Sequence, residues 1–316
     1  MDVRFLRVFL AAMTLAVLSA CATAPAQKTT TTTGAAPSER AEPPPPAQNL
    51  LGTTDDLQLV TELSLDLARK YGGNNVLVVM DIDNTLLAME QDLGSDQWYY
   101  WQAEMAGTHP CSSMVVNDLL AAQGALFFAS AMRPTQPNAA EQIRRMQDAG
   151  LRVIALSSRG YEYRLSTFRE LRRNGFSFWP SAWPPEVGFG GAFTAQGLTR
   201  PIAYEDGVGF LSGQDKGLAL KALLDRSGAA YPTLIVMADD KQEHLNNVMK
   251  AFSWSSTKVH AWRYTHEDDA VAAFSPSAAA AEWKALRPAL MTIQDVLGPD
   301  NYELPASDIP AGCGSR

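Results

Sequence analysis

The sequence predicts an α/β fold, a Rossmann-like doubly wound parallel sheet with helices on both faces. Three short apolar runs are rich in branched residues, at 76–80, 151–156 and 234–238. Each run stops at a polar residue, as buried parallel strands do. Helical patterns alternate with them, and a further strand is expected at 259–264. Because ligands of such sheets bind at the carboxyl ends of the strands, we expect a functional site there.

The expected helices carry an apolar face and a glycine stop. In the first, Thr53 to Lys70, one face holds Leu57, Val60, Leu63 and Leu67, and Gly72 follows. Three further helices are expected at 139–148, 161–174 and 217–226, the last two of which end near Gly175 and Gly228.

Two carboxylates and a hydroxyl follow the first apolar run at alternate positions: Asp81, Asp83 and Thr85. Alternate residues of an extended chain point the same way, so the two acids can converge. Close carboxylates repel each other unless one binds a proton or a cation lies between them, which predicts a metal, split pKa values, or both. The alternative is an acidic turn after a strand.

This Asp-x-Asp-x-Thr sequence resembles the first motif of the haloacid dehalogenase (HAD) superfamily, in its phosphatase branch. The resemblance implies the HAD fold, with Asp81 as the nucleophile for a phosphoryl group. Asp83 would protonate the leaving oxygen and later activate water, and Thr85 would contact the substrate. Dehalogenases of the superfamily lack the second acid and its ion pumps carry Thr there, so Asp83 favours phosphate esters.

The second run ends at Ser157, Ser158 and Arg159, where the superfamily has a hydroxyl that binds phosphoryl oxygens. Ser157 is the expected residue, and Ser158 is the neighbour that the sequence does not exclude. The triplet also resembles the hydroxyl-small-Arg signature of bacterial secreted acid phosphatases, in which Arg159 would fork onto phosphate oxygens. The alternative for a serine at a strand end is a helix N-cap.

The third and fourth elements of the resemblance are a lysine and a second acidic pair. Lys216 opens the expected helix at 217–226 and would offset charge around the phosphoryl group, although an isolated helix lysine is usually a solvated surface residue. Asp239 and Asp240 end the run 234–238. Their alternative is to cap the next helix, a role compatible with metal binding.

Oxygen ligands from these segments suit Mg²⁺. We expect the Asp81 carboxylate, the Asp83 carbonyl and Asp239 to bind the metal together with water, and Asp240 to act through a water or as support. The sequence leaves open which of Asp239 and Asp240 binds directly. The histidines show no spacing suited to a soft metal: His109, His244, His260 and His266.

Two segments are expected beside the site. Residues 88–135 correspond to a cap or flap insertion, in which Trp98 and Tyr99 would stack on a flat group of the substrate, such as a nucleobase. The alternative for these aromatic residues is to fill a core. Residues 176–203 contain several glycines among aromatic residues and are expected to form a β-hairpin excursion: Gly188, Gly190, Gly191 and Gly197.

The N-terminus predicts export. Residues 1–20 fit a signal peptide, with an apolar run too short to span a bilayer, and the sequence up to Cys21 is similar to a bacterial lipoprotein processing site. Cys21 would carry the lipid, unless it lies beside an ordinary cleavage site by chance. Ala22 then indicates the outer membrane, facing the periplasm, in a cell with two membranes. Residues 21–50 would be a disordered tether, 51–300 the phosphatase domain and 301–316 a tail.

Composition narrows the function further. A net charge of −8 and a pI near 5.1 argue against a nucleic-acid surface. Cys111 and Cys313 remain after Cys21, and whether they pair is left open.

The leading hypothesis is a Mg²⁺-dependent phosphomonoesterase that acts through an aspartyl-phosphate on small phosphate esters, with nucleotides as one option. Alternatives are a phosphotransferase of the same fold and a catalytically silent anchored protein that binds a partner. Oligomeric state and physiological substrate stay open.

Overall fold

The computed structural model describes residues 46–299, 302–310 and 312–314, and each structural statement below concerns these residues. They belong to one compact unit, 44–316. Residues 1–45, with the expected signal peptide, Cys21 and most of the expected tether, lie outside the described residues. Within the described ranges no helix combines the length and the apolar character needed to cross a bilayer.

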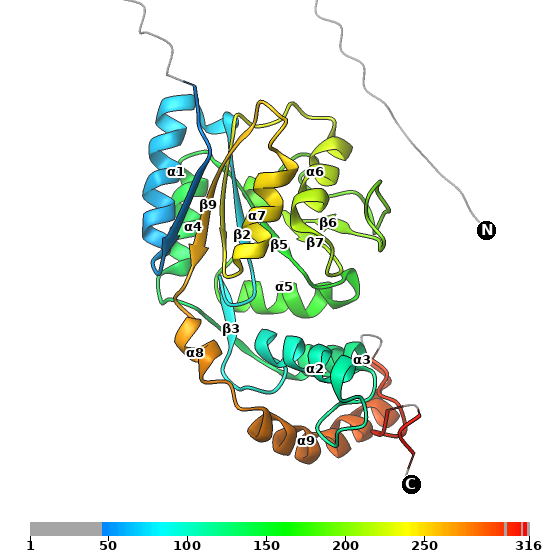
Figure 1. The fold of residues 1–316 in the computed structure, drawn as a ribbon. Coiled ribbons are helices and arrows are strands. Elements are labelled where there is room, and N and C mark those ends of the chain that lie inside the picture. The colour runs from blue at the N-terminus through cyan, green and yellow to red at the C-terminus, as the bar shows by residue number, and fades with distance from the viewer. Residues whose placement is uncertain (1–45, 300–301, 311, 315–316) are drawn as a thin grey trace, which may run out of the picture. The chain divides into compact units, whose positions relative to one another are not determined.

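A seven-stranded sheet forms the centre of the unit, in the order β1-β9-β8-β2-β5-β7-β6 (Figure 1). Every neighbouring pair is parallel except β6 and β7. The strands are β1 (Leu50–Thr54), β2 (Val76–Asp81), β5 (Arg152–Ser157), β6 (Ala203–Glu205), β7 (Val208–Phe210), β8 (Leu234–Asp239) and β9 (Lys258–Tyr264). The α/β class with a mostly parallel, Rossmann-like sheet is therefore confirmed.

Helices cover both faces of this sheet (Figure 1). One face packs on α1 (Leu57–Tyr71), α4 (Ala139–Asp148) and α5 (Arg164–Arg173), and the other on α6 (Lys216–Ser227) and α7 (Gln242–Ala251). Alternate residues of one strand enter opposite cores: Val78 of β2 belongs to the first and Val79 to the second. This double burial is the reason that the central strands read as unbroken apolar runs.

The N-terminal edge of the sheet differs from expectation. Strand β1 occupies the residues where the first helix was expected to begin, and α1 starts at Leu57, with the Asp56 side chain accepting a hydrogen bond from the Gln58 N–H. Asn49 Oδ1 accepts from the Val259 N–H at 2.9 Å, so the end of the expected tether is fixed to β9. Because β1 pairs with a strand some 200 residues later, no local pattern marks it.

The hairpin expected within 176–203 is wrong. Its four glycines all have positive φ, which suits turns and irregular chain rather than strands. Apart from one isolated bridge between Phe193 and Ile202, the segment contains no strand before β6. The hairpin follows it, formed by β6 and β7 around a turn at Asp206 and Gly207.

A helical layer, here called the cap (residues 90–131, 276–299 and the described part of 302–314), lies at the end of the sheet where β2 and β9 leave it (Figure 1). A short antiparallel ribbon of β3 (Leu87–Met89) and β4 (Met132–Pro134) connects it to the sheet. It holds α2 (Asp96–Thr108), α3 (Leu119–Ala129) and, after α8 (Asp268–Ala272), the long α9 (Pro276–Leu297). The cap therefore combines an insertion with the C-terminal segment.

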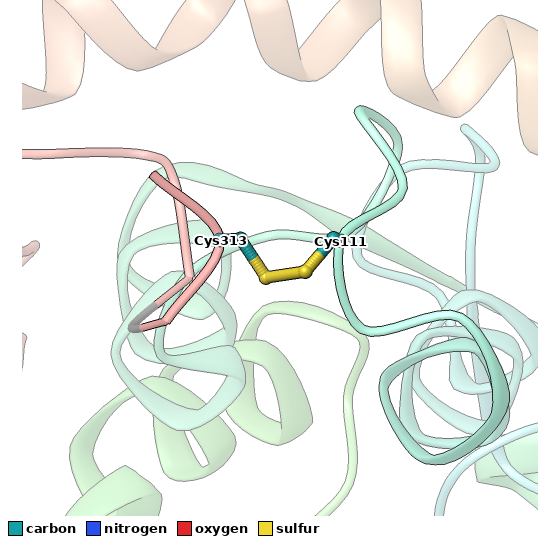
Figure 2. Close-up of a disulfide and its surroundings, with 2 residues drawn as sticks. All are labelled: Cys111 and Cys313. Carbon is teal, nitrogen blue, oxygen red and sulfur yellow. A yellow bond between two sulfur atoms is a disulfide. The ribbon is translucent and has the colours of Figure 1, made fainter. Parts of the chain in front are cut away.

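The cap has its own core and a covalent link. Trp98 and Leu126 of the insertion pack with Trp283 of α9 and with Tyr302 of the tail. A disulfide joins Cys111, after α2, to Cys313, with a Cα–Cα distance of 5.3 Å (Figure 2). The pairing that the sequence left open is thus made, and the described tail residues are part of the cap.

Candidate active site at the strand ends

Asp81 and Asp239 meet because their strands are adjacent and in register. β2 and β8 pair Met80 with Ala238, so the next residues of both strands lie side by side. Asp81 lies two residues after Val79, and Asp239 two residues after Met237, so each acid points to the same face of the sheet as that apolar residue. The side chains of Val79 and Met237 enter the core that α6 and α7 cover. Two carboxylates therefore point to the side on which α6 begins.

Lys216, the first residue of α6, lies between these two carboxylates. Its Nζ donates to Asp81 Oδ1 at 2.5 Å and to Asp239 Oδ2 at 2.7 Å, and the residue has no exposed surface. The solvated alternative for Lys216 is therefore wrong. A buried lysine of this kind is held by both acids rather than by water.

Burial and charge shift the pKa values of these groups in different directions. Burial raises the pKa of Asp81 to about 6, although the Lys216 ammonium opposes the rise. Burial also acts against ionisation of Asp239, but Lys216 and His244 outweigh it and hold its pKa at about 2. Burial disfavours the Lys216 ammonium, yet the two carboxylates outweigh it and raise the pKa of the lysine.

Asp240 completes a carboxylate group whose ligand atoms from Asp81, Asp239 and Asp240 all lie within 4.8 Å of one another. Burial, with the charges of the neighbouring acids, raises the pKa of Asp240 well above its ordinary value. Its carboxylate has no hydrogen-bond partner among the described residues. Three converging oxygen donors, one of them unpartnered, fit a hard divalent cation such as Mg²⁺. The Asp83 carboxylate is outside this group.

Thr85 ties the two acidic loops together. Its hydroxyl donates to Asp81 Oδ2 at 3.1 Å and accepts from the Asp240 N–H at 3.0 Å. The hydroxyl has its one hydrogen on Asp81 and is also bound to the loop of Asp240, so these contacts replace the expected contact between Thr85 and substrate. Its hydroxyl orients the carboxylates instead.

Asp83 is held by Arg159. The guanidinium donates through Nε and Nη2 to the two carboxylate oxygens, at 3.0 and 2.7 Å. Its Cζ lies 3.9 Å from the ring centroid of Phe127 in the cap, and its Nη1 donates to the Thr167 hydroxyl. Arg159 was expected to fork onto phosphate, and the structure corrects this, because the fork is already made to Asp83.

The two serines differ in position. Ser157 ends β5 and is fully buried, with its Oγ accepting a hydrogen bond from the Arg159 N–H at 3.1 Å. Ser158 is half-buried and lines a cavity of about 210 Å³ between the cap and the strand ends, together with Asp83 and Arg159. Ser157 is therefore buried at the strand end, and Ser158 is the serine that lines the cavity.

Of the two cap residues expected to contact the substrate, one lines the cavity and the other does not. Tyr99 lines it, beside Tyr100 and Phe127. Trp98 is fully buried in the cap core and lines no part of the cavity. The structure therefore corrects the assignment of Trp98 to substrate binding, in favour of the core role that aromatic residues usually have.

Two groups that the sequence reasoning did not assign belong to the site. His244 Nδ1, in the first turn of α7, lies 2.9 Å from Asp239 Oδ1, within hydrogen-bonding distance. Lys241 Nζ donates to Asp96 Oδ2 of the cap at 2.6 Å and lies 3.5 Å from the ring centroid of Tyr100. The proximity of His244 and Lys241 to Asp239 and Asp240 in sequence is the signal that could have found them.

The family assignment rests on one match. A family model described as "Protein of unknown function (DUF2608)" matches residues 57–294. No curated protein matches the chain. The matched range begins with α1, ends within α9, and includes every residue of the carboxylate group. The chain therefore belongs to the DUF2608 family.

Proposed function

We propose that the protein is a Mg²⁺-dependent phosphomonoesterase of the HAD type, acting on small phosphate esters through an aspartyl-phosphate on Asp81. The observation that carries the proposal is the buried Lys216 ammonium between Asp81 and Asp239, with Asp240 beside them. A fold needs no such cluster for stability, because the desolvation free energy of buried charges is about as large as the attraction between them. Groups of this kind are typical of functional sites.

Asp81, Asp83 and Arg159 each have a definite role in the proposed reaction. An Asp81 carboxylate oxygen attacks phosphorus, the bond from phosphorus to the ester oxygen breaks, and Asp83 gives that oxygen a proton. Asp83 then takes a proton from water, which attacks the phosphoryl group and releases Asp81 and inorganic phosphate. Arg159 fixes the Asp83 carboxyl for both steps. Such acid-base help is worth roughly 10² to 10⁴ in rate.

Charge stabilisation supplies the rest of the proposed catalysis. Phosphoryl transfer spreads negative charge over the peripheral oxygens, so cations and hydrogen-bond donors matter most. Lys216 offers a buried ammonium, and Ser157 or Ser158 offers a hydroxyl. Mg²⁺ held by Asp81, Asp239 and Asp240 would offset charge on the phosphoryl oxygens. The cap forms one wall of the cavity beside Asp83.

The direct test uses the compact unit, residues 44–316, which contains every described element and core cluster. Phosphate monoesters are screened with and without Mg²⁺, and phosphate release is measured for the wild type, Asp81→Asn and the exposed control Asp148→Asn. We expect hydrolysis that depends on Mg²⁺, a loss of at least about 10³-fold in Asp81→Asn, and wild-type rates in the control. A wild type without activity, or an active Asp81→Asn, contradicts the proposal.

We further propose that the protein works in the bacterial cell envelope, anchored through a lipid on Cys21 and facing the periplasm from the outer membrane. The disulfide supports an oxidising compartment. Expression of the full chain with a radiolabelled fatty acid tests the anchor. Label and membrane association should be present in the wild type and absent in Cys21→Ser, and an unlabelled wild type contradicts it.

A further inference from the structure

The cavity beside Asp83 has two unlike walls. The cap side is aromatic and apolar, with Tyr99 and Tyr100 from α2 and Leu120 and Phe127 from α3. The sheet side consists of residues that follow β5 and β7, including Gly213, and of Arg200, which precedes β6. A flat apolar group suits the first wall, and polar substituents suit the second.

Among the charged residues that line the cavity, two have no oppositely charged partner in the described part of the chain. Asp83 is paired with Arg159, and Asp96 with Lys241. Glu162 and Arg200 line the same cavity, and neither has an ion pair among the described residues. One cation and one anion are therefore available to a ligand.

The Arg200 guanidinium is already oriented. Its Nε donates to the Ser212 carbonyl at 2.7 Å and its Nη2 to the Gly213 carbonyl at 3.1 Å, which leaves Nη1 without a hydrogen bond to described residues. An arginine fixed by two backbone carbonyls loses little conformational freedom when a carboxylate binds the remaining donors.

Glu162 lies close by. Its carboxylate oxygens lie over Gly160, where a Cβ would meet them at 2.2 Å. The Gly160 and Gly213 loops are neighbours, because the Ser212 N–H donates to the Arg159 carbonyl at 3.1 Å and the Gly213 N–H to the Ser158 carbonyl at 2.8 Å. Arg200 binds the carbonyls of the Gly213 loop, so the free cation is attached to the loop that neighbours the free anion.

Resting on the proposed phosphatase function, we propose that Arg200 and Glu162 select phosphate esters of phenols that carry a zwitterionic amino-acid head. The ring packs against the aromatic wall with its ester oxygen towards Asp83, the carboxylate binds Arg200, and the ammonium binds Glu162. Hydrolysis releases the free phenol and inorganic phosphate, as for any monoester. Both charges of the head then meet a partner, which neither a neutral nor a singly charged head provides.

Four probes test this by deleting one charge at a time. O-phospho-L-tyrosine carries both charges, and the phosphate ester of 3-(4-hydroxyphenyl)propionate carries only the carboxylate. Tyramine phosphate carries only the ammonium, and 4-ethylphenyl phosphate carries neither charge. The reacting phenol ester is the same in all four, because two carbons separate it from the charges. kcat and KM are measured for the wild type, Arg200→Gln and Glu162→Gln, with exposed controls Arg69→Gln and Glu282→Gln.

For the wild type we expect kcat/KM to be highest for phosphotyrosine and to fall about tenfold with each charge removed, mainly through KM. Arg200→Gln should lower the values only for the two probes with a carboxylate, and Glu162→Gln only for the two with an ammonium. The controls should match the wild type.

Two results overturn the inference: equal kcat/KM for all four probes in the wild type, or an equal loss on all four in either variant, which marks a structural role. The proposed phosphatase function fails separately. A wild type that hydrolyses 4-ethylphenyl phosphate but shows no charge preference retains that function and loses this inference, whereas a wild type inactive on every ester loses both.

Discussion

The carboxylate cluster and the cap differ in what brings their distant parts together. Asp81 and Asp239 end neighbouring strands, Asp240 follows the second of them, and Lys216 opens a helix, so the sheet itself brings the acids together. The cap core instead packs Trp98 on one segment against Trp283 on another, and its disulfide spans a sequence separation of 202 residues. The proposed chemistry thus depends on the sheet, and the aromatic wall of the cavity depends on tertiary contacts of the cap.

The two regions also hold their charges differently. Lys216 and Asp239 have no exposed surface, whereas the side chains of Lys241 and Asp96, which join the cap to the loop after β8, are 27% and 18% exposed. Removal of one partner leaves an uncompensated charge in the first case and a partly hydrated one in the second. Stability measurements can therefore separate the regions.

The largest effect on stability is expected from Lys216→Met. It leaves Asp81 and Asp239 without their buried cation, and we expect a loss of about 3–5 kcal/mol in the free energy of unfolding at pH 7, measured in urea. The control, Lys221→Met on the same helix, breaks an exposed pair with Asp225 and should cost about 1 kcal/mol or less. Equal losses in the two variants would show that the cluster is not an energetically coupled unit.

The next effect concerns the cap alone. Replacement of Cys111 and Cys313 by serine should lower the free energy of unfolding by about 2–4 kcal/mol, because the open chain has more unfolded conformations. Dithiothreitol should destabilise the wild type to the same extent and leave the double variant unchanged. Neither cysteine lines the cavity, so kcat for a small ester should stay near the wild-type value. A loss of kcat as large as that in Asp81→Asn would contradict the separation of the regions.

Metal affinity should depend on pH through Asp81. A carboxylate ligand must be ionised, and the pKa of Asp81 is raised to about 6, while that of Asp239 is about 2. Mg²⁺ affinity should therefore fall as pH drops below about 6, by at least about tenfold per pH unit, because the metal displaces a proton from Asp81. Where Asp240 is protonated as well, the metal displaces a second proton from Asp240, whose pKa is also raised. Calorimetric titration at pH 5, 6 and 7 measures it, and constant affinity over this range would exclude Asp81 as a ligand.

The smallest effect is expected at the contact between cap and sheet. Asp96→Asn removes the partner of Lys241, and the free energy of unfolding should change by about 1 kcal/mol or less. Amide hydrogen exchange should become faster in α2 while the central strands stay protected. Glu282→Gln, on α9, serves as the control. Faster exchange throughout the sheet would mean that this pair stabilises the whole unit.

The sequence was informative wherever one local pattern determines the structure. The strand ends at Asp81, Ser157 and Asp239, and the stop of α1 at Gly72, follow from apolar runs and a glycine that adopts positive φ. The location of the site could be predicted for the same reason, because adjacent parallel strands bring their carboxyl ends together independently of the loop conformations.

The features that the sequence could not predict depend on residues that are distant along the chain. Arg159 contacts Asp83 because Phe127 and Thr167, from two other helices, fix the guanidinium. α9 has local signals in its Ser275 N-cap and Gly298 C-cap, but nothing local places it in the cap. Trp98 likewise belongs to a core that α3 and α9 complete from other parts of the chain.

The disulfide and the C-terminal contribution to the cap have a consequence for biosynthesis. Synthesis reaches Cys111 first and Cys313 after a further 202 residues, so every acid of the cluster has been made before the aromatic wall of the cavity has its full support. A premature stop codon after β9 would still encode every acid of the cluster but would leave Trp98 and Leu126 without their packing partners. Nascent protein would thus contain every acid of the proposed reaction centre before the aromatic wall of the cavity has all of its packing partners.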